Sequence, residues 1–226
     1  MSLCRVYELG VLEFEKALQL QDYLTLARCA GDIPDTIILL QHPSIFTFGR
    51  STREEDIVVP RSSHDIEGIT ILQTDRGGSV TYHGPGQLVL YLILNLKAKG
   101  IGIHQYVHNL EEVVIRTLDD FCIKSFRDSR YPGVWVGSEK ICALGVRVRR
   151  WCTKHGLALN VNTDLRYFDY IVPCGILGSR VTSMAKVLGY EVAIEDVASR
   201  ILEHCAQIFD LTIWQKSGEK LDDYYV

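Results

Sequence analysis

The chain has 226 residues, 47% of them hydrophobic and 23% charged, and its formal net charge is −4. This length suits one well-packed domain and is short for two. A slightly acidic chain gives no global reason to expect nucleic acid or an anionic membrane as a partner, and we expect neither. Charges are spread through the first 21 residues, and no apolar run approaches a bilayer-spanning length. We therefore expect a soluble, cytoplasmic protein.

The cysteines favour free thiols over a disulfide framework. There are seven, an odd number, scattered from Cys4 to Cys205 in a chain for which we expect no export signal. No two have the CxxC spacing, and Cys152 with His155 cannot by themselves fill a tetrahedral zinc site. We expect no metal.

The N-terminal half begins with a predicted helix. Apolar residues at helical spacing among charges predict this helix over residues 12–28, and residues 36–49 are typical of a strand followed by a loop. A run rich in Leu, Val and Ile over residues 88–96 predicts a buried strand.

Residues 76–87, "RGGSVTYHGPGQ", precede that strand and contain four glycines. Such a segment can cradle a phosphate or let a ligand lie against the main chain, but it has no GxxxxGK[ST] pattern and leads into a strand, not a helix. Pro85 and Gly86 suit the central positions of a type II turn. A simple hairpin turn is the plain alternative.

The C-terminal half mixes helices and strands. Apolar residues at steps of three or four predict a helix over 104–122. Alternation on both sides of a Gly-Ser-Glu turn predicts a hairpin over 133–148, with Lys140 at the start of its second strand. A further strand over 156–162 is expected after a loop over 149–155.

Two more helices complete the predicted fold. The first runs over 179–189 from a cap at Ser179 to Gly189, and the second over 194–213. The pattern predicts an α+β fold, a mixed and mostly antiparallel sheet flanked by helices. We expect a single domain over 1–215 and a polar tail over 216–226.

Several side chains are candidates for chemistry, each with a structural alternative. Cys174 lies in "IVPCGI" before a predicted helix, where a thiolate can be stabilised, although the local sequence by itself favours a small buried hydrophobe. The local sequence favours a solvated turn lysine over a functional one at Lys140, and it favours hydrogen-bonded core groups over bases at His83 and His155. A basic cluster is either a solvated edge or a docking site for an acidic partner; its members are Arg147, Arg149, Arg150 and Lys154.

Three long motifs change this balance. Three segments occur in this order: "DRGGSVTYHGPGQLVLYLILNL", "GVWVGSEKICALGVRVRRWCTKHGLALNVNTDL" and "IVPCGILGSRVTSM". Cys174 lies 34 positions after Lys140. Together the three segments resemble the lipoyl(octanoyl) transferase family of lipoate biosynthesis. The resemblance implies a fold similar to the catalytic domain of biotin and lipoate protein ligases. It also implies an acyltransferase that moves an octanoyl group from acyl carrier protein to a lysine of a lipoyl domain, without ATP or any cofactor. The acceptors would be lipoyl domains of 2-oxoacid dehydrogenase complexes and the glycine cleavage H protein.

The resemblance also implies site residues. By position, Cys174 matches the family's acyl-thioester nucleophile and Lys140 its partner. The substrate-contacting segments are matched by Arg76, Gly77, Gly78, Ser79, Val80, Thr81, Tyr82, His83, Ala143, Leu144, Gly145, Gly156, Leu157 and Ala158. In such a site glycines would leave room for an apolar acyl chain against the backbone, with each buried methylene contributing roughly 0.8 kcal/mol.

A cysteine and a lysine supply what this transfer needs. The lysine ammonium stabilises the thiolate, and once the sulfur is acylated the lysine can accept the proton of the incoming amine. Three other functions remain open on the same residues: an ATP-dependent lipoate or biotin ligase, a thioesterase or protease that pairs Cys174 with His83 or His155, and a non-catalytic acyl-binding module.

Overall fold

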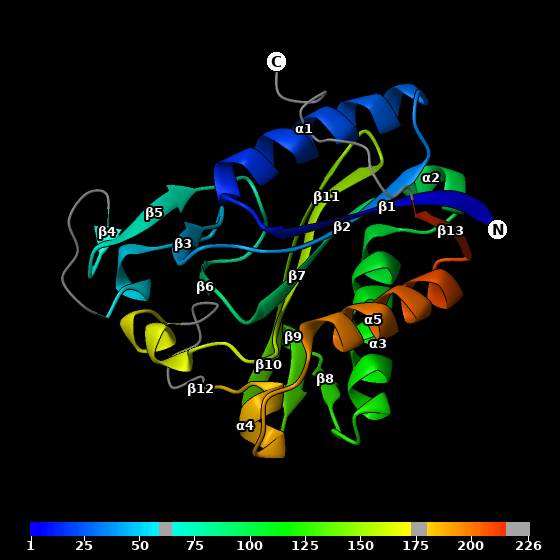
Figure 1. The fold of residues 1–226 in the computed structure, drawn as a ribbon. Helices are drawn as coiled ribbons and strands as arrows, with labels where there is room; N and C mark the ends of the chain where they lie inside the picture. Colours follow the sequence, from blue (N-terminus) through cyan, green and yellow to red (C-terminus); the bar gives the residue numbers. More distant parts are fainter. Residues whose placement is uncertain (59–64, 173–179, 216–226) are drawn as a thin grey trace.

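The computed structural model describes residues 1–58, 65–172 and 180–215, and these residues form two sheets with helices around them (Figure 1). The larger sheet has the order β13-β1-β2-β7-β11-β10-β9-β8, and β12 pairs with β10 outside this path. Its strands are β1 (Ser2–Val11), β2 (Asp35–Gln41), β7 (Gln87–Ile93), β8 (Phe126–Asp128), β9 (Tyr131–Val136), β10 (Glu139–Arg149), β11 (Cys152–Asn160), β12 (Arg180–Val181) and β13 (Leu211–Gln215). The pairs of β1 with β13, β1 with β2 and β10 with β12 are parallel, whereas the others are antiparallel. The expected mixed, mostly antiparallel sheet is confirmed.

The smaller sheet lies at one end of the larger one, at the left of Figure 1. Its strands, in the order β4-β5-β3-β6, are β3 (Ile45–Phe48), β4 (Asp65–Ile66), β5 (Ile69–Gln73) and β6 (Val80–His83). The chain passes from β6 to β7 through the expected turn: Gly86 has φ of 81°, and the Gln87 N–H donates to Gly84 O at 3.1 Å. The turn is not a hairpin, however, because β6 and β7 pair in different sheets.

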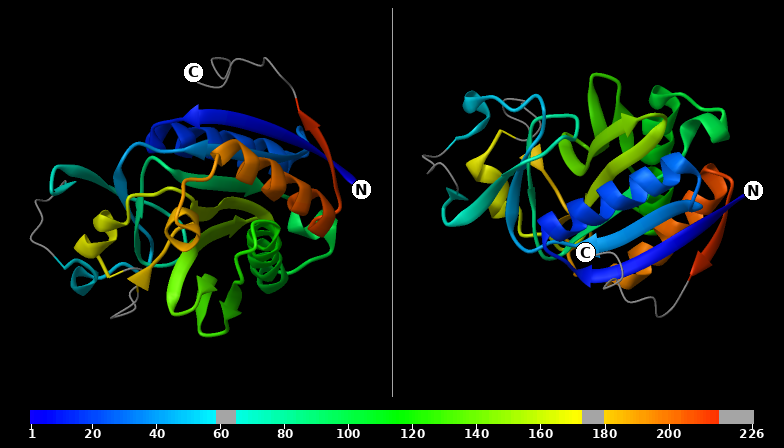
Figure 2. Two further views of the ribbon diagram at one scale, coloured as in Figure 1. Left: turned by 60° about the horizontal axis from the view of Figure 1, so that its bottom comes forward. Right: turned by 90° about the horizontal axis from the view of Figure 1, so that it is seen from above.

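Helices cover both faces of the larger sheet (Figure 2). The helix α1 packs its apolar side on one face, against β7 and β11, whereas α3 and α5 pack together on the other. The helices are α1 (Phe14–Ala30), α2 (Leu96–Lys99), α3 (Ile103–Asp120), α4 (Met184–Leu188) and α5 (Ile194–Ile208), with 3₁₀ turns at Glu54–Asp56 and Leu165–Tyr170. The helices predicted over 12–28 and 104–122 are therefore confirmed to within two residues at each end.

The predicted loop over 149–155 is wrong. The strands β10 and β11 form a long hairpin joined by Arg150 and Trp151 alone, which have φ of 48° and 67°. Two left-handed residues give the turn a twist that matches the twist of the flanking strands. Because this turn usually carries Asn or Gly, Arg-Trp gave no signal for it. Residues 152–155, including His155, consequently belong to β11.

The C-terminal helices are shorter than predicted. Ser183, whose hydroxyl accepts from the Lys186 N–H, caps α4, and Gly189 ends it at φ of 83° as expected. Residues 180–181 form β12 instead of helix, and the Ser179 cap lies outside the described residues. The helix predicted over 194–213 ends at Ile208, since Asp210 has φ of 53° and β13 then pairs with β1. For β1 itself no strand was predicted. The 216–226 tail also lies outside the described residues.

Candidate active site

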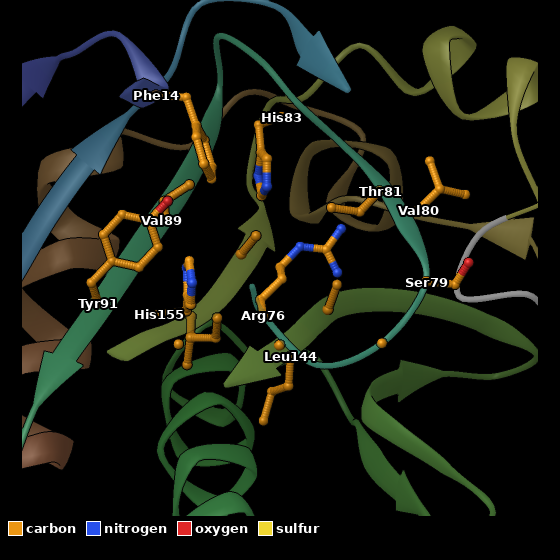
Figure 3. Close-up of a pocket in the computed structure, with 16 residues that line it drawn as sticks. Phe14, Arg76, Ser79, Val80, Thr81, His83, Val89, Tyr91, Leu144 and His155 are labelled. Carbon is orange, nitrogen blue, oxygen red and sulfur yellow. The ribbon is translucent and has the colours of Figure 1, made fainter. Parts of the chain in front are cut away.

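A pocket opens where the α1 face of the larger sheet meets the glycine-rich segment and β6 (Figure 3). The pocket brings together the three segments expected to contact substrate, 76–83, 143–145 and 156–158. Its lining residues are Phe14, Arg76, Gly78, Ser79, Val80, Thr81, His83, Val89, Tyr91, Ala143, Leu144, Gly145, His155, Gly156, Leu157 and Ala158. Of the expected residues, Gly77 lines an adjoining groove, and the Tyr82 ring packs away from the pocket on Phe46 and Phe168.

Small residues form the floor of the pocket. Gly145 on β10 stands opposite Gly156 on β11, and Ala143 stands opposite Ala158. Since side chains alternate along a strand, these four positions share one face of the sheet. A Cβ on Gly156 would lie 2.1 Å from the Leu90 carbonyl oxygen, so this glycine also permits close approach of β7. The floor therefore leaves room for an unbranched chain lying directly on the sheet.

The glycine-rich segment packs its backbone onto β10. The Gly77 N–H donates to Val146 O at 3.1 Å, and Gly78 adopts φ of 84°, where a side chain is disfavoured. A Cβ on Gly145 would lie 3.1 Å from both Gly77 O and the Arg76 Cδ. The glycines thus serve close approach of two backbones over the pocket floor.

Arg76 and His83 are held by a residue the sequence did not single out, Thr47 on β3. The Arg76 guanidinium donates to Thr47 O at 2.6 Å and to Thr47 Oγ1 at 3.0 Å. Burial holds the pKa of His83 well below its usual range, so the ring is neutral. Its Nδ1 donates to Gln87 Oε1 at 2.8 Å, which leaves Nε2 to accept from the Thr47 hydroxyl at 3.3 Å. These contacts fit a fixed polar wall.

His155 reaches the pocket from β11 through an unusual backbone conformation, with φ of 63°. The backbone N–H of His155 donates to Gln21 Oε1 at 2.8 Å, and the ring Nε2 lies 2.7 Å from Asp75 Oδ1. Burial lowers the pKa of His155, although the Asp75 hydrogen bond opposes the shift. That same bond, with Lys154 nearby, holds the pKa of Asp75 far below its usual range. A neutral imidazole therefore donates to an ionised carboxylate.

Phe14, Val89 and Tyr91 close the side of the pocket next to α1 (Figure 3). The Tyr91 hydroxyl lies 2.8 Å from His42 Nε2, and His42 Nδ1 lies 2.7 Å from Leu12 O. Burial lowers the pKa of His42 to about 4, so Nδ1 donates to the carbonyl and Nε2 accepts from the tyrosine. The sequence held no local signal that these residues form one wall, because Phe14 comes from α1 whereas Val89 and Tyr91 come from β7.

Lys140 is buried, with 3% of its surface exposed, so it is not the solvated turn lysine that local sequence favoured. Its Nζ donates to Pro132 O at 3.0 Å and lies 4.8 Å from the centre of the Trp135 ring. The groove that Lys140 lines shares Gly78, Leu144 and Gly145 with the pocket. Lys140 therefore lies beside the β10 end of the pocket.

Cys174 lies outside the described residues, which resume at Arg180. Just after Arg180 the chain pairs with the backbone of Lys140. Val181 is the partner of Lys140 in the β10–β12 pair, and the Thr182 N–H donates to Lys140 O at 2.9 Å. The pairing of Cys174 with Lys140 stays a prediction.

The basic cluster is partly neutralised. Lys154 is buried and pairs with Asp22, and Arg147 pairs with Asp75 at 3.3 Å. Only Arg149 and Arg150 are exposed. Arg149 is nine residues beyond Lys140 along β10, which is about 30 Å at the strand rise. The predicted docking role therefore rests on two arginines far from Lys140.

Within residues 1–58, 65–172 and 180–215, no group of three or more His, Cys, Asp or Glu side chains is arranged to hold a metal ion. No helix of that same part of the chain is long and apolar enough to cross a bilayer. Its six cysteines are free thiols.

Comparison with known proteins gives the family. The sequence-family model of the lipoyl protein ligase A/B catalytic domain matches residues 13–206. The chain belongs to this family. An octanoyltransferase of Alkaliphilus metalliredigens is 46% identical over 209 residues, which are 92% of this chain and 96% of the relative. The family resemblance drawn from the three motifs is thus confirmed, and the protein is an enzyme of the transferase class.

Solved structures agree on the fold. A bipartite lipoate protein ligase from Thermoplasma acidophilum, studied with its E2 lipoyl domain, superposes with a TM-score of 0.69 at 14% identity and covers 98% of this chain and 88% of its own. The biotin protein ligase of Aquifex aeolicus gives a TM-score of 0.54 at 13% identity, and the match covers 91% of this chain and 69% of the ligase. The expected likeness to biotin and lipoate ligase catalytic domains is confirmed.

Proposed function

We propose that this protein transfers an octanoyl group from octanoyl-acyl carrier protein to the acceptor lysine of a lipoyl domain, through a thioester on Cys174. The observation that carries the proposal is the pocket floored by small residues, which adjoins the buried amine of Lys140. The 46% identical octanoyltransferase, matched over almost its whole length, supports octanoyl transfer as the reaction.

In the first half-reaction, the Cys174 thiolate attacks the carbonyl carbon of the carrier thioester. The C–S bond to the carrier breaks, and the carrier thiolate takes the proton that Lys140 releases and leaves as a thiol. The octanoyl group remains on Cys174. The Lys140 ammonium stabilises the attacking thiolate, and its contacts with Pro132 O and the Trp135 ring hold it in place.

In the second half-reaction, the acceptor amine attacks the Cys174 thioester. An amide bond forms, the C–S bond breaks, and Lys140, which has released its proton after acylation, takes the proton that the amine loses. The enzyme returns to its starting protonation state.

The proposed acceptors are lipoyl domains of 2-oxoacid dehydrogenase complexes and the glycine cleavage H protein. The Thermoplasma acidophilum lipoate protein ligase, which has a similar fold, was studied together with its E2 lipoyl domain, and this supports an acceptor of this kind. The catalytic unit we propose spans residues 1–215, because β13, which pairs with β1, ends at Gln215.

Transfer in a purified system tests this function. The protein is mixed with octanoyl-acyl carrier protein and an unmodified lipoyl domain, with and without ATP. The mass of the lipoyl domain is then followed over time by mass spectrometry. We expect the lipoyl domain to gain one octanoyl group at the same rate in both reactions. A strict need for ATP would make the protein a ligase, and release of free octanoate with an unmodified lipoyl domain would make it a thioesterase.

A further inference from the structure

The end of the pocket opposite Lys140 has a defined position on the sheet. Gly145 on β10 stands opposite Gly156 on β11, and Gly156 stands opposite Tyr91 on β7. The groove of Lys140 meets the pocket at Gly78, Leu144 and Gly145, which is the β10 side. A chain that enters beside Lys140 therefore crosses β10 and β11 and points its far end at β7.

This path has the length of an eight-carbon chain. Three adjacent strands span two inter-strand spacings, about 10 Å. An extended octanoyl group has seven C–C bonds of about 1.5 Å, each advancing the chain by about 1.25 Å, which gives about 9 Å from carbonyl to methyl. The floor is small at the first two strands and becomes large at the third, where Tyr91 and Val89 replace Gly and Ala.

The large residues at this end are held firmly. Phe14, at the first turn of α1, is 2% exposed and packs 4.8 Å from the His42 ring and 5.6 Å from the His83 ring. His42 in turn bonds to Tyr91 Oη and to Leu12 O, two residues before Phe14. Since packed interiors do not deform at low cost, this end cannot yield to a longer chain.

We propose that Phe14 and Tyr91 form a stop that sets the acyl-chain length at eight carbons. The stop rests on the proposed function for the orientation of the chain, with its carbonyl beside Lys140. Each carbon beyond the eighth would have to displace the Phe14 ring or bend away from the floor.

Removal of the Phe14 ring tests the stop. Wild type, Phe14→Ala and the milder Phe14→Leu are compared in single-turnover transfer from hexanoyl-, octanoyl-, decanoyl- and dodecanoyl-acyl carrier protein. We expect the decanoyl-to-octanoyl rate ratio to rise about 15-fold in Phe14→Ala, the factor for two further buried methylenes at roughly 0.8 kcal/mol each. Phe14→Leu should give a smaller rise in the same direction.

Phe209→Ala is the matched control. Phe209 is also a buried phenylalanine, 4% exposed, but it packs on Tyr106 in the core on the other face of the sheet. Its removal should lower thermal stability and leave the chain-length profile unchanged. The opposite substitution, Ala158→Val, narrows the floor opposite Val89 and should favour hexanoyl over octanoyl.

A binding series separates this proposal from the proposed function. Calorimetric affinities of saturated carboxylic acids with six to twelve carbons should peak at eight carbons in wild type and at ten or more in the Phe14 variants, whether or not transfer occurs. If both Phe14 variants fold and keep the wild-type profile in binding and transfer, the stop is refuted while octanoyl transfer stands. If wild type transfers no chain at all but the affinity peak shifts as expected, the proposed function is refuted and the stop stands.

Discussion

Addition of one methyl group at Gly156 should disrupt both the sheet and the pocket. A Cβ at this position would lie 2.1 Å from the Leu90 carbonyl oxygen, 3.2 Å from its carbon and 3.3 Å from the Tyr91 Cα. All three are backbone atoms of β7, so no side-chain rotation relieves the overlap. The β7 and β11 backbones must separate by about 1 Å to restore ordinary contact.

The expected cost is at the upper end of the range for overpacking, about 3 kcal/mol in the free energy of unfolding. For a chain of this size that corresponds to a Tm lower by roughly 6–12 °C. Transfer should also fall at least tenfold, because the shift moves Tyr91, the direct partner of Gly156, relative to the pocket floor. Thermal unfolding by circular dichroism and single-turnover transfer measure the two effects.

Gly102→Ala is the control. Gly102 has φ of −87°, and a Cβ there would meet no atom within 4 Å, so only its N-cap position before α3 carries a cost, less than about 1 kcal/mol. Transfer should be unaffected. Equal Tm values for Gly156→Ala and Gly102→Ala would show that close approach of β7 does not require a glycine at position 156.

Two further predictions concern titratable groups. Lys140→Arg keeps a positive charge but cannot act as a base near neutral pH. Its Cys174 should therefore be alkylated faster than that of Lys140→Ala, whereas its acyl-enzyme should still fail to pass the octanoyl group to a lipoyl domain. Transfer from the Lys140→Arg acyl-enzyme at the wild-type rate would leave Lys140 an electrostatic role only. Burial lowers the pKa of His42 from 6.5 to about 4, so between these values the unfolded chain binds a proton that the folded protein does not. The contribution of the neutral His42 ring to the free energy of unfolding is complete above pH 6.5 and is lost as the pH falls toward 4. The pKa values of His83 and His155 are lowered as well, so these residues act in the same direction. Urea unfolding at pH 7 and pH 5 should show this loss, and His42→Asn should reduce it; a loss of equal size in His42→Asn would contradict the assignment.

Features whose causes are local in the chain could be predicted. The helical spacing in α3, the alternation around the Gly137 turn and the left-handed cap at Gly189 each depend on residues a few positions apart. The pairing of β1 with β13 joins the two ends of the described chain, and a strand pair so distant leaves no local pattern. Arg150 and Trp151 form a turn that their residue types disfavour, and the hairpin they close overrides that preference.

The candidate site divides in the same way. Motif resemblance located the floor and the glycine-rich segment, because those residues form contiguous segments. Phe14 and Tyr91 line the pocket from two separate elements, and Thr47 on a third holds Arg76. Each of the three looks like an ordinary core residue in its own segment. Only the packing of α1, β3 and β7 around the floor shows what they do. The burial of Lys140 likewise follows from its neighbours on β9, not from its turn.

The most direct test of the central claim is the mass of the intact protein after mixing with octanoyl-acyl carrier protein in the absence of any acceptor. We expect one octanoyl group per chain, located on Cys174 by peptide mapping, and no adduct in Cys174→Ala. The thiols on β10 and β11 are poor alternatives: Cys142 and Cys152 are fully buried, and burial raises the pKa of Cys152 to about 12. An adduct that persists in Cys174→Ala, or that maps to Cys142 or Cys152, would contradict the account.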